Sequence, residues 1–85
     1  MKLLIVGLGS MGKRRARLIR GMDGAIEVCG VDSAPTRRAE AAALGILAYA
    51  DIGEAAAAHR FDAALVCTAP LSHAGIITQL LGLGL

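Results

Sequence analysis

Short apolar runs alternate along this chain with longer segments in which apolar residues recur every three or four positions. Uninterrupted apolar runs are typical of strands covered on both faces, whereas the longer period is typical of amphipathic helices. The runs predict strands at residues 2–6, 26–32, 46–49 and 63–67. The longer segments predict helices at residues 10–22, 35–44, 52–58 and 72–83. This strict alternation predicts an α/β fold with a parallel sheet.

The expected fold class is a doubly wound parallel sheet with helices on both faces. Because crossovers between parallel strands are right-handed, the four predicted strands should lie in the order third, second, first, fourth. Hydrophobic residues make up 55% of the 85 residues and aromatic residues 2%, so we expect a core of Leu, Ile, Val and Ala. This composition favours buried parallel strands over an aromatic-rich β-sandwich.

Local signals indicate how the first two helices begin, end and face the sheet. Ser10 is a suitable N-cap for the first helix, and Gly45 is a suitable C′ residue after the second. An apolar stripe at three-to-four spacing should face the sheet from the first helix. The stripe consists of Gly12, Ala16, Ile19 and Met22.

The third predicted helix has a signal at each end. Asp51, with Glu54 three residues later, matches a capping box. His59 stands where this helix ends, and we expect an exposed residue stabilised by the helix dipole rather than a catalytic group.

No segment indicates export, a membrane span or a metal site. No apolar run approaches the roughly 18–20 residues that a membrane-spanning helix needs. The apolar start of the chain is similar to that of a signal peptide, but five basic residues between positions 13 and 20 interrupt it. Cys29 and Cys67 match no metal spacing, and their predicted strands lie too far apart in the sheet for a disulfide. We therefore expect a cytoplasmic protein with two buried structural thiols.

The most informative motif joins the first strand to the first helix. It spans residues 7–12, Gly-Leu-Gly-Ser-Met-Gly, in the pattern G-x-G-x-x-G. We expect Gly7 to allow a tight turn, Gly9 to let a pyrophosphate approach the backbone, and Gly12 to let the helix pack closely on the sheet. The N–H groups at the start of the helix would then form an anion site. With its flanking strand and helix, the motif predicts dinucleotide binding.

Asp32 ends the second predicted strand, 20 residues after Gly12. A carboxylate at this place in a dinucleotide fold accepts hydrogen bonds from the adenosine ribose. The alternative is an N-cap or turn residue before Pro35. Such a carboxylate repels the 2′-phosphate of NADP, so NAD is the expected cofactor. NADP remains open, because Arg37 or Arg38 could reach that phosphate or stack on adenine.

Basic residues are concentrated on the first predicted helix, and we expect most of them to form its solvated face. They are Lys13, Arg14, Arg15, Arg17 and Arg20. The helix dipole disfavours cations in the first turn, and a bound anion would relieve this conflict. The formal net charge of +2 is too small to imply nucleic acid as a partner, and one Tyr and one Phe leave little to stack on bases.

Three stretches together carry a family resemblance: residues 5–12, residues 28–32, and residues 62–68 followed by His73. With them the chain resembles the N-terminal part of the NAD(P)-binding Rossmann domain of the glucose-fructose oxidoreductase / inositol dehydrogenase / MocA (Gfo/Idh/MocA) family. The first stretch is common to many dinucleotide folds, and its combination with Thr68 and His73 is more specific. The resemblance implies an NAD(P)-dependent oxidoreductase acting on a sugar, a cyclitol or a similar polyol.

The resemblance also implies a set of cofactor contacts, with Thr68 and the two residues after it lining the cleft and His73 starting the next helix beside it. The family commonly has Pro-Asn after the threonine, where this chain has Ala-Pro, so the sequence departs from the family there. The expected cofactor-binding residues are Gly7, Gly9, Ser10, Met11, Gly12, Asp32, Arg37, Thr68, Ala69, Pro70 and His73.

In the family, the last predicted helix is followed by a fifth strand ending in Glu-Lys-Pro and by a substrate domain with the catalytic acid and base. We therefore expect residues 1–85 to be a partial dinucleotide-binding domain, inactive alone and prone to self-association through the apolar edge of strand 63–67. One alternative is a nucleotide-sensing regulatory module without catalysis. Another is a truncated product that no longer binds anything.

Overall fold

In a computed structural model, apolar runs of this chain form parallel strands that alternate with helices. The structure describes residues 1–22, 26–67 and 73–82. Within these ranges the strands are β1 (Lys2–Val6), β2 (Glu27–Val31), β3 (Leu47–Tyr49) and β4 (Ala63–Val66). The helices are α1 (Ser10–Met22), α2 (Pro35–Ala43), α3 (Ile52–Ala58) and α4 (His73–Gly82).

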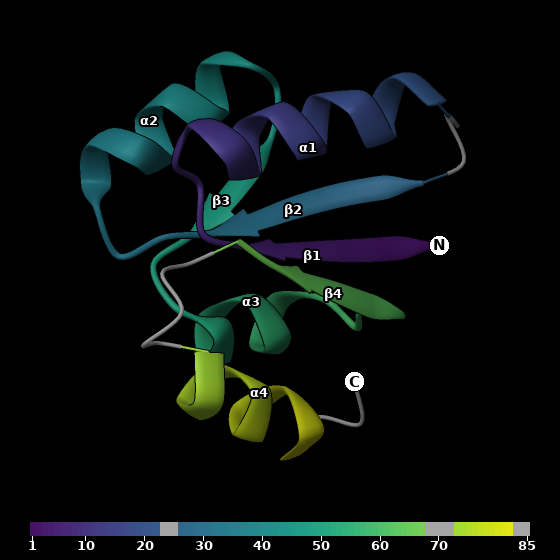
Figure 1. Ribbon diagram of the computed structural model, residues 1–85, viewed down its shortest axis with the longest axis vertical. Helices are drawn as coiled ribbons and strands as arrows, with labels where there is room; N and C mark the ends of the chain where they lie inside the picture. Colours follow the sequence, from purple (N-terminus) through teal and green to yellow (C-terminus); the bar gives the residue numbers. More distant parts are fainter. Residues whose placement is uncertain (23–25, 68–72, 83–85) are drawn as a thin grey trace.

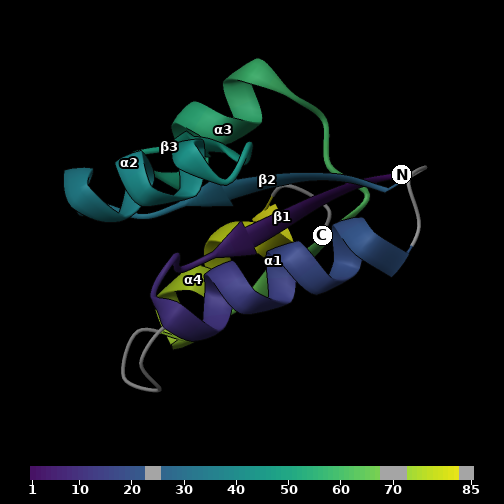
Figure 2. The same cartoon turned by 90° about the horizontal axis from the view of Figure 1, so that it is seen from above.

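The strands form one parallel sheet in the order β3-β2-β1-β4. Helices α1 and α2 cover one face of this sheet, and α3 and α4 cover the other (Figure 1). Figure 2 shows the molecule from above, along the direction in which these layers are stacked. The predicted fold class and strand order are both confirmed. In this order the chain reverses its winding direction between β1 and β4, the place where doubly wound sheets bind ligands.

Each face of the sheet has its own hydrophobic core, because successive residues of a strand point to opposite faces. On the α3–α4 face, the buried residues are Leu4, Val6, Cys29, Val31, Ile52, Ala55 and Phe61. On the α1–α2 face, they are Ile5, Leu8, Ala16, Val28, Ala41 and Ile46. Covering both faces explains why the central strands read as continuous apolar runs.

The two cysteines belong to different faces. Cys29 is buried in the core on the α3–α4 face, and Cys67 packs, half-buried, against the core on the α1–α2 face. Both thiols are free, so the prediction that they form no disulfide is confirmed. The expectation of two buried thiols is correct for Cys29, whereas Cys67 is only half-buried. Burial raises the pKa of both thiols above its usual value.

Most predicted element boundaries lie within one residue of the observed ones. The predicted ends of the last helix, Ser72 and Leu83, lie outside the described residues. Gly45 has a φ of +80°, as expected of a C′ residue after α2. The Asp51 carboxylate accepts a hydrogen bond from the Glu54 N–H at 2.7 Å, as expected of an N-cap. Met22, however, does not face the sheet and is 82% exposed. At about 100° per residue, it lies roughly 80° around the helix from Gly12 and so outside the buried stripe.

His59 is half-buried rather than exposed, so that expectation is wrong. Its Nδ1 lies 2.9 Å from Lys2 Nζ, and its Nε2 lies 2.7 Å from the Tyr49 hydroxyl. Its ring also contacts the rings of Tyr49 and Phe61. Because an ammonium group has no acceptor, Nδ1 must accept from Lys2, which leaves Nε2 to donate to Tyr49. His59 therefore ties the end of α3 to β1 and β3.

Candidate dinucleotide-binding site

The turn between β1 and α1 depends on glycine at two positions, Gly7 and Gly12. Gly7 has a φ of +100°, a conformation that favours glycine, and its N–H donates to the Val31 carbonyl at 2.7 Å. A Cβ added at Gly12 would lie 1.9 Å from the Gly7 carbonyl oxygen and 3.6 Å from Cys67 Cβ. The predicted roles of Gly7 in the turn and of Gly12 in close packing are therefore confirmed.

Helix α1 spans Ser10–Met22, as predicted, but its N-cap is not the predicted residue. Ser10 is already helical, and the Lys13 N–H donates to the Gly9 carbonyl at 3.0 Å. An N-cap residue is the one whose carbonyl accepts the first bond within the helix, so Gly9 is the N-cap and the assignment of Ser10 is wrong. A glycine N-cap leaves the first N–H groups of α1 uncovered by a side chain.

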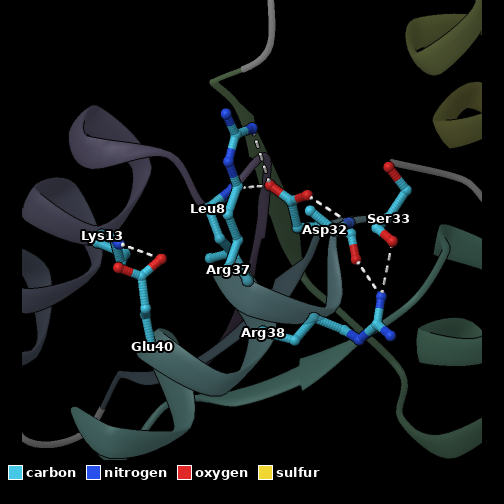
Figure 3. Close-up of polar contacts among 8 residues, drawn as sticks. Leu8, Lys13, Asp32, Ser33, Arg37, Arg38 and Glu40 are labelled. Carbon is cyan, nitrogen blue, oxygen red and sulfur yellow. Dashed lines mark hydrogen bonds and ion pairs between the residues drawn. The ribbon is translucent and has the colours of Figure 1, made fainter.

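Asp32 lies immediately after β2 (Figure 3). It is almost entirely buried, with 8% of the residue exposed. Its Oδ2 accepts a hydrogen bond from the Leu8 N–H at 2.9 Å, and its Oδ1 accepts one from the Ala34 N–H at 2.9 Å. The bond to Ala34 is a local turn contact, as the alternative role for Asp32 predicts. The bond to Leu8 joins the carboxylate to the glycine turn.

Two neighbouring arginines of α2 act differently around this carboxylate. Arg37 Nη1 lies 3.5 Å from Asp32 Oδ2, and its side chain is 56% exposed. Arg38 Nη1 instead donates to the carbonyl oxygens of Asp32 and Ser33, at 2.8 and 3.0 Å. Arg37 therefore lies beside the carboxylate, whereas Arg38 is engaged in holding the turn between β2 and α2.

The Asp32 carboxyl is held in its charged form. Burial by itself would raise its pKa, but the N–H groups of Ala34 and Leu8 and the positive charge of Arg37 outweigh burial and lower it below the usual value. The carboxyl is thus a buried anion at neutral pH.

A cleft of about 690 Å³ opens at the carboxyl edge of the sheet and contains both the glycine turn and Asp32. This volume is in the usual range for small-molecule sites. Its walls come from the ends of β1 and β2, the start of α1, the segment after β3, and α4. Its lining residues include Gly7, Gly9, Ser10, Met11, Asp32 and Arg37. The expected anion site and the expected ribose site thus share one cleft.

Across its full length, residues 1–85, the chain matches the Gfo/Idh/MocA family, described as "Oxidoreductase family, NAD-binding Rossmann fold". The chain belongs to the Gfo/Idh/MocA family. It is an NAD-binding Rossmann domain of oxidoreductase type, as the sequence resemblance implies. Searches of curated proteins and of solved structures gave no significant match.

Part of the expected Gfo/Idh/MocA site lies beyond what the structure describes. Thr68, Ala69 and Pro70 lie outside the described residues, and His73 is described only as the first residue of α4. Gly12 supports the cleft from behind by its packing against Gly7 and does not line it.

Several cleft residues were missed from the sequence. Asp51 and Ile52, after β3, and Ile76 and Gln79, on α4, all line the cleft. The strand order contains a signal for the first two, because the end of β3 lies beside the end of β2 at the same edge. Leu8 was also missed, since an apolar residue inside a glycine motif does not suggest a hydrogen bond from its backbone.

The basic face of α1 is mostly solvated, as expected. Arg14 and Arg17 are exposed, whereas Lys13 is half-buried and lies 3.2 Å from Glu40 of α2. Arg20 donates to the Leu44 carbonyl at 2.7 Å. A larger groove, of about 860 Å³, is lined by residues of α1 and α2, several of them charged, and by Leu44. Of the two, only the smaller cleft contains both the glycine turn and Asp32.

The described residues contain neither a metal-binding cluster nor a membrane-spanning helix. Among them, no group of three or more His, Cys, Asp or Glu side chains is placed to hold a metal ion. None of their helices combines the length and the apolar character required to cross a membrane.

Proposed function

We propose that these 85 residues bind NAD for an oxidoreductase that transfers hydride between the nicotinamide and a sugar, a cyclitol or a similar polyol. The observation that carries the proposal is the single cleft that joins the start of α1 to the buried, ionised Asp32. Membership of the Gfo/Idh/MocA family supports the reaction type. NAD supplies the hydride chemistry, and the chain binds and orients it.

The start of α1 fits a pyrophosphate. The Lys13 N–H is the first to find a partner within the helix, so the three N–H groups before it have none there. Because the N-cap is Gly9, no side chain covers these donors; a Cβ at Gly9 would meet only the tip of Arg37, 4.0 Å away. Free N–H groups and the positive end of the helix dipole favour an anion at this place.

The Asp32 carboxylate fits the adenosine ribose. An ionised carboxylate offers about four acceptor positions. Leu8, Ala34 and Arg37 engage three of them, so one position remains for a ribose hydroxyl. The local turn and the ribose contact are therefore compatible roles for the same side chain.

The same carboxylate favours NAD over NADP. A buried anion beside the ribose repels a 2′-phosphate, since both carry negative charge. Arg37 is already paired with Asp32, so part of its attraction for a phosphate is cancelled. Arg38 is bound to two backbone carbonyls and is a poor candidate for phosphate recognition.

Isothermal titration of the chain with NAD and NADP tests the proposal. We expect NAD to bind more tightly than NADP, and Asp32→Asn to weaken NAD and reduce the preference. Asp62→Asn is a matched control, because it removes the same charge from a carboxylate that accepts from the Lys2 N–H, away from the cleft. Absence of binding at millimolar NAD, or equal weakening by both substitutions, would contradict the proposal.

Residues 68–70 and His73 enter the proposal through the family resemblance, as a further part of the cofactor cleft. The proposal also assigns only the cofactor half of the reaction to residues 1–85, with the substrate pocket and proton-transfer group supplied from outside them.

We further propose that copies of this chain associate through β4. This strand lies at an edge of the sheet, and its residues Ala63–Val66 are only half-buried. Unpaired backbone groups at such an edge tend to pair with another strand. Sedimentation velocity at rising concentration should show a dimer that Ala63→Lys weakens, and a monomer throughout would contradict the proposal.

A further inference from the structure

Leu8 is held by the fold at both its backbone and its side chain. Its N–H donates to Asp32 Oδ2 at 2.9 Å, and its side chain is completely buried. The side chain belongs to the core on the α1–α2 face, together with Ala16 of α1 and Ala41 of α2. A residue inside the glycine turn is thus anchored in the hydrophobic core.

The Leu8 side chain packs against β2 at Gly30, where the strand has no side chain. In the sheet, Gly30 lies between Ile5 of β1 and Ala48 of β3. A Cβ added at Gly30 would lie 2.5 Å from Leu8 Cδ2 and 2.8 Å from Leu8 Cδ1. The φ of Gly30 is not in the left-handed region, so its backbone does not require glycine. The requirement comes from the space that Leu8 occupies.

We propose that Leu8 and Gly30 are positioning residues for the dinucleotide. Because Gly30 has no side chain, the Leu8 side chain packs directly against β2, and this packing fixes the position of the glycine turn relative to Asp32. The affinity consequence rests on the proposed function, because it assumes that NAD binds in this cleft. The geometric consequence, at the Leu8–Asp32 hydrogen bond, does not depend on any ligand.

The turn has little freedom to absorb a displaced Leu8. On the β2 side, the Gly7 N–H is bonded to the Val31 carbonyl at 2.7 Å, so two consecutive N–H groups of the turn are tied to the end of β2. On the α1 side, the Gly7 carbonyl is so close to Gly12 that an added methyl group there would lie 1.9 Å from it. A methyl group at residue 30 should therefore move Leu8 and its N–H together, away from Asp32.

Gly30→Ala tests this inference through two measurements. We expect the dissociation constant for NAD to rise by about tenfold, in line with the coupling energies of residues in contact. In the cofactor-free chain, carboxyl NMR titration should show the pKa of Asp32 rising toward its usual value, because the Leu8 N–H is one of the groups that lower it. Gly21→Ala is the matched control, since nothing lies within 4 Å of a Cβ there, and it should change neither measurement.

A second substitution distinguishes displacement of Leu8 from a general disruption of the hydrophobic core. In the Gly30→Ala background, Leu8→Val shortens the side chain of residue 8 and so makes room for the methyl group added at residue 30. Such volume-conserving exchanges are well tolerated. We expect the double variant to recover most of the NAD affinity and the lowered pKa of Asp32.

The outcomes are distinguishable. A folded Gly30→Ala chain with unchanged affinity and unchanged Asp32 titration would overturn the inference. If Gly30→Ala does not fold, the double variant decides: recovery of folding and binding supports the packing of Leu8 against Gly30, and failure to recover overturns it. If the unaltered chain does not bind NAD, the proposed function fails, and the Asp32 titration still tests the Leu8–Gly30 pair.

Discussion

The polar cluster around Asp32 and the one around His59 are built from different groups. Asp32 is held largely by the backbone N–H groups of Leu8 and Ala34, which the strand end and the turn keep in place. His59 is held through side-chain ends, by the ammonium group of Lys2 and the hydroxyl of Tyr49. Backbone donors add little side-chain entropy cost when they bind, whereas a lysine must give up several rotamers. The Asp32 cluster is therefore already in place before a ligand binds, whereas the His59 cluster links secondary-structure elements to one another.

Of the substitutions that distinguish the Asp32 cluster from the His59 cluster, Gly12→Ala should have the largest effect on stability and on NAD binding. The added Cβ would lie 1.9 Å from the Gly7 carbonyl oxygen, a backbone atom that cannot rotate away. We expect a loss of about 3 kcal/mol in the free energy of unfolding, together with loss of NAD binding. Denaturant unfolding and titration calorimetry measure both. Gly75→Ala, a helical glycine with nothing within 4 Å of the added Cβ, should be neutral or stabilising; equal effects of the two substitutions would refute the close-packing role of Gly12.

Asp32→Asn should have the next largest effect, with a pH dependence of known sign. The folded-state pKa of Asp32 is lowered, so its charge stabilises the fold above the unfolded pKa of about 4, and that stability is lost as pH falls through the folded value. We expect a deficit of about 2 kcal/mol at pH 7, as for a hydrogen-bonded buried charge. Denaturant unfolding at several pH values should show the deficit shrinking below about pH 4. A deficit that stays constant in acid would mean that the charge of Asp32 contributes nothing.

Tyr49→Phe should have the smallest effect and should leave the cofactor site intact. It removes the hydroxyl that lies 2.7 Å from His59 Nε2 and keeps the ring. We expect a loss of about 1 kcal/mol in the free energy of unfolding, with an unchanged dissociation constant for NAD. Thermal unfolding measures the loss of stability, and titration calorimetry measures the dissociation constant for NAD. A clear loss of NAD affinity would show that the His59 cluster is coupled to the cleft, and the contrast between the two clusters would then fail.

The fold was largely predictable because its signals are local. Continuous apolar runs identify β1 and β2, and the glycines of residues 7–12 identify the turn between β1 and α1. Once the elements alternate, the handedness of crossovers leaves few possible strand orders. Met22 was misplaced because its spacing from Ile19 is correct for a helix, but its angle from Gly12 is not.

The site was predictable only in part, because side-chain partners depend on the assembled sheet. Arg37 and Arg38 are neighbours in sequence, yet one faces the Asp32 carboxylate and the other faces backbone carbonyls. Nothing local distinguishes them. Likewise, Gly30 has no turn or special backbone angle to mark it. Its role follows only from Leu8, whose side chain packs against it in the folded chain.

The close contacts at Gly12 and Gly30 have a consequence for how this gene can vary. A glycine codon becomes an alanine codon by a single base change, and alanine is usually the mildest replacement. Here that change places a carbon 1.9 Å from a carbonyl oxygen at one position and 2.5 Å from a buried methyl group at the other. Even the smallest available mutational step thus meets a close contact at these two codons, whereas Arg14 and Arg17 of α1 are exposed and leave room for replacement.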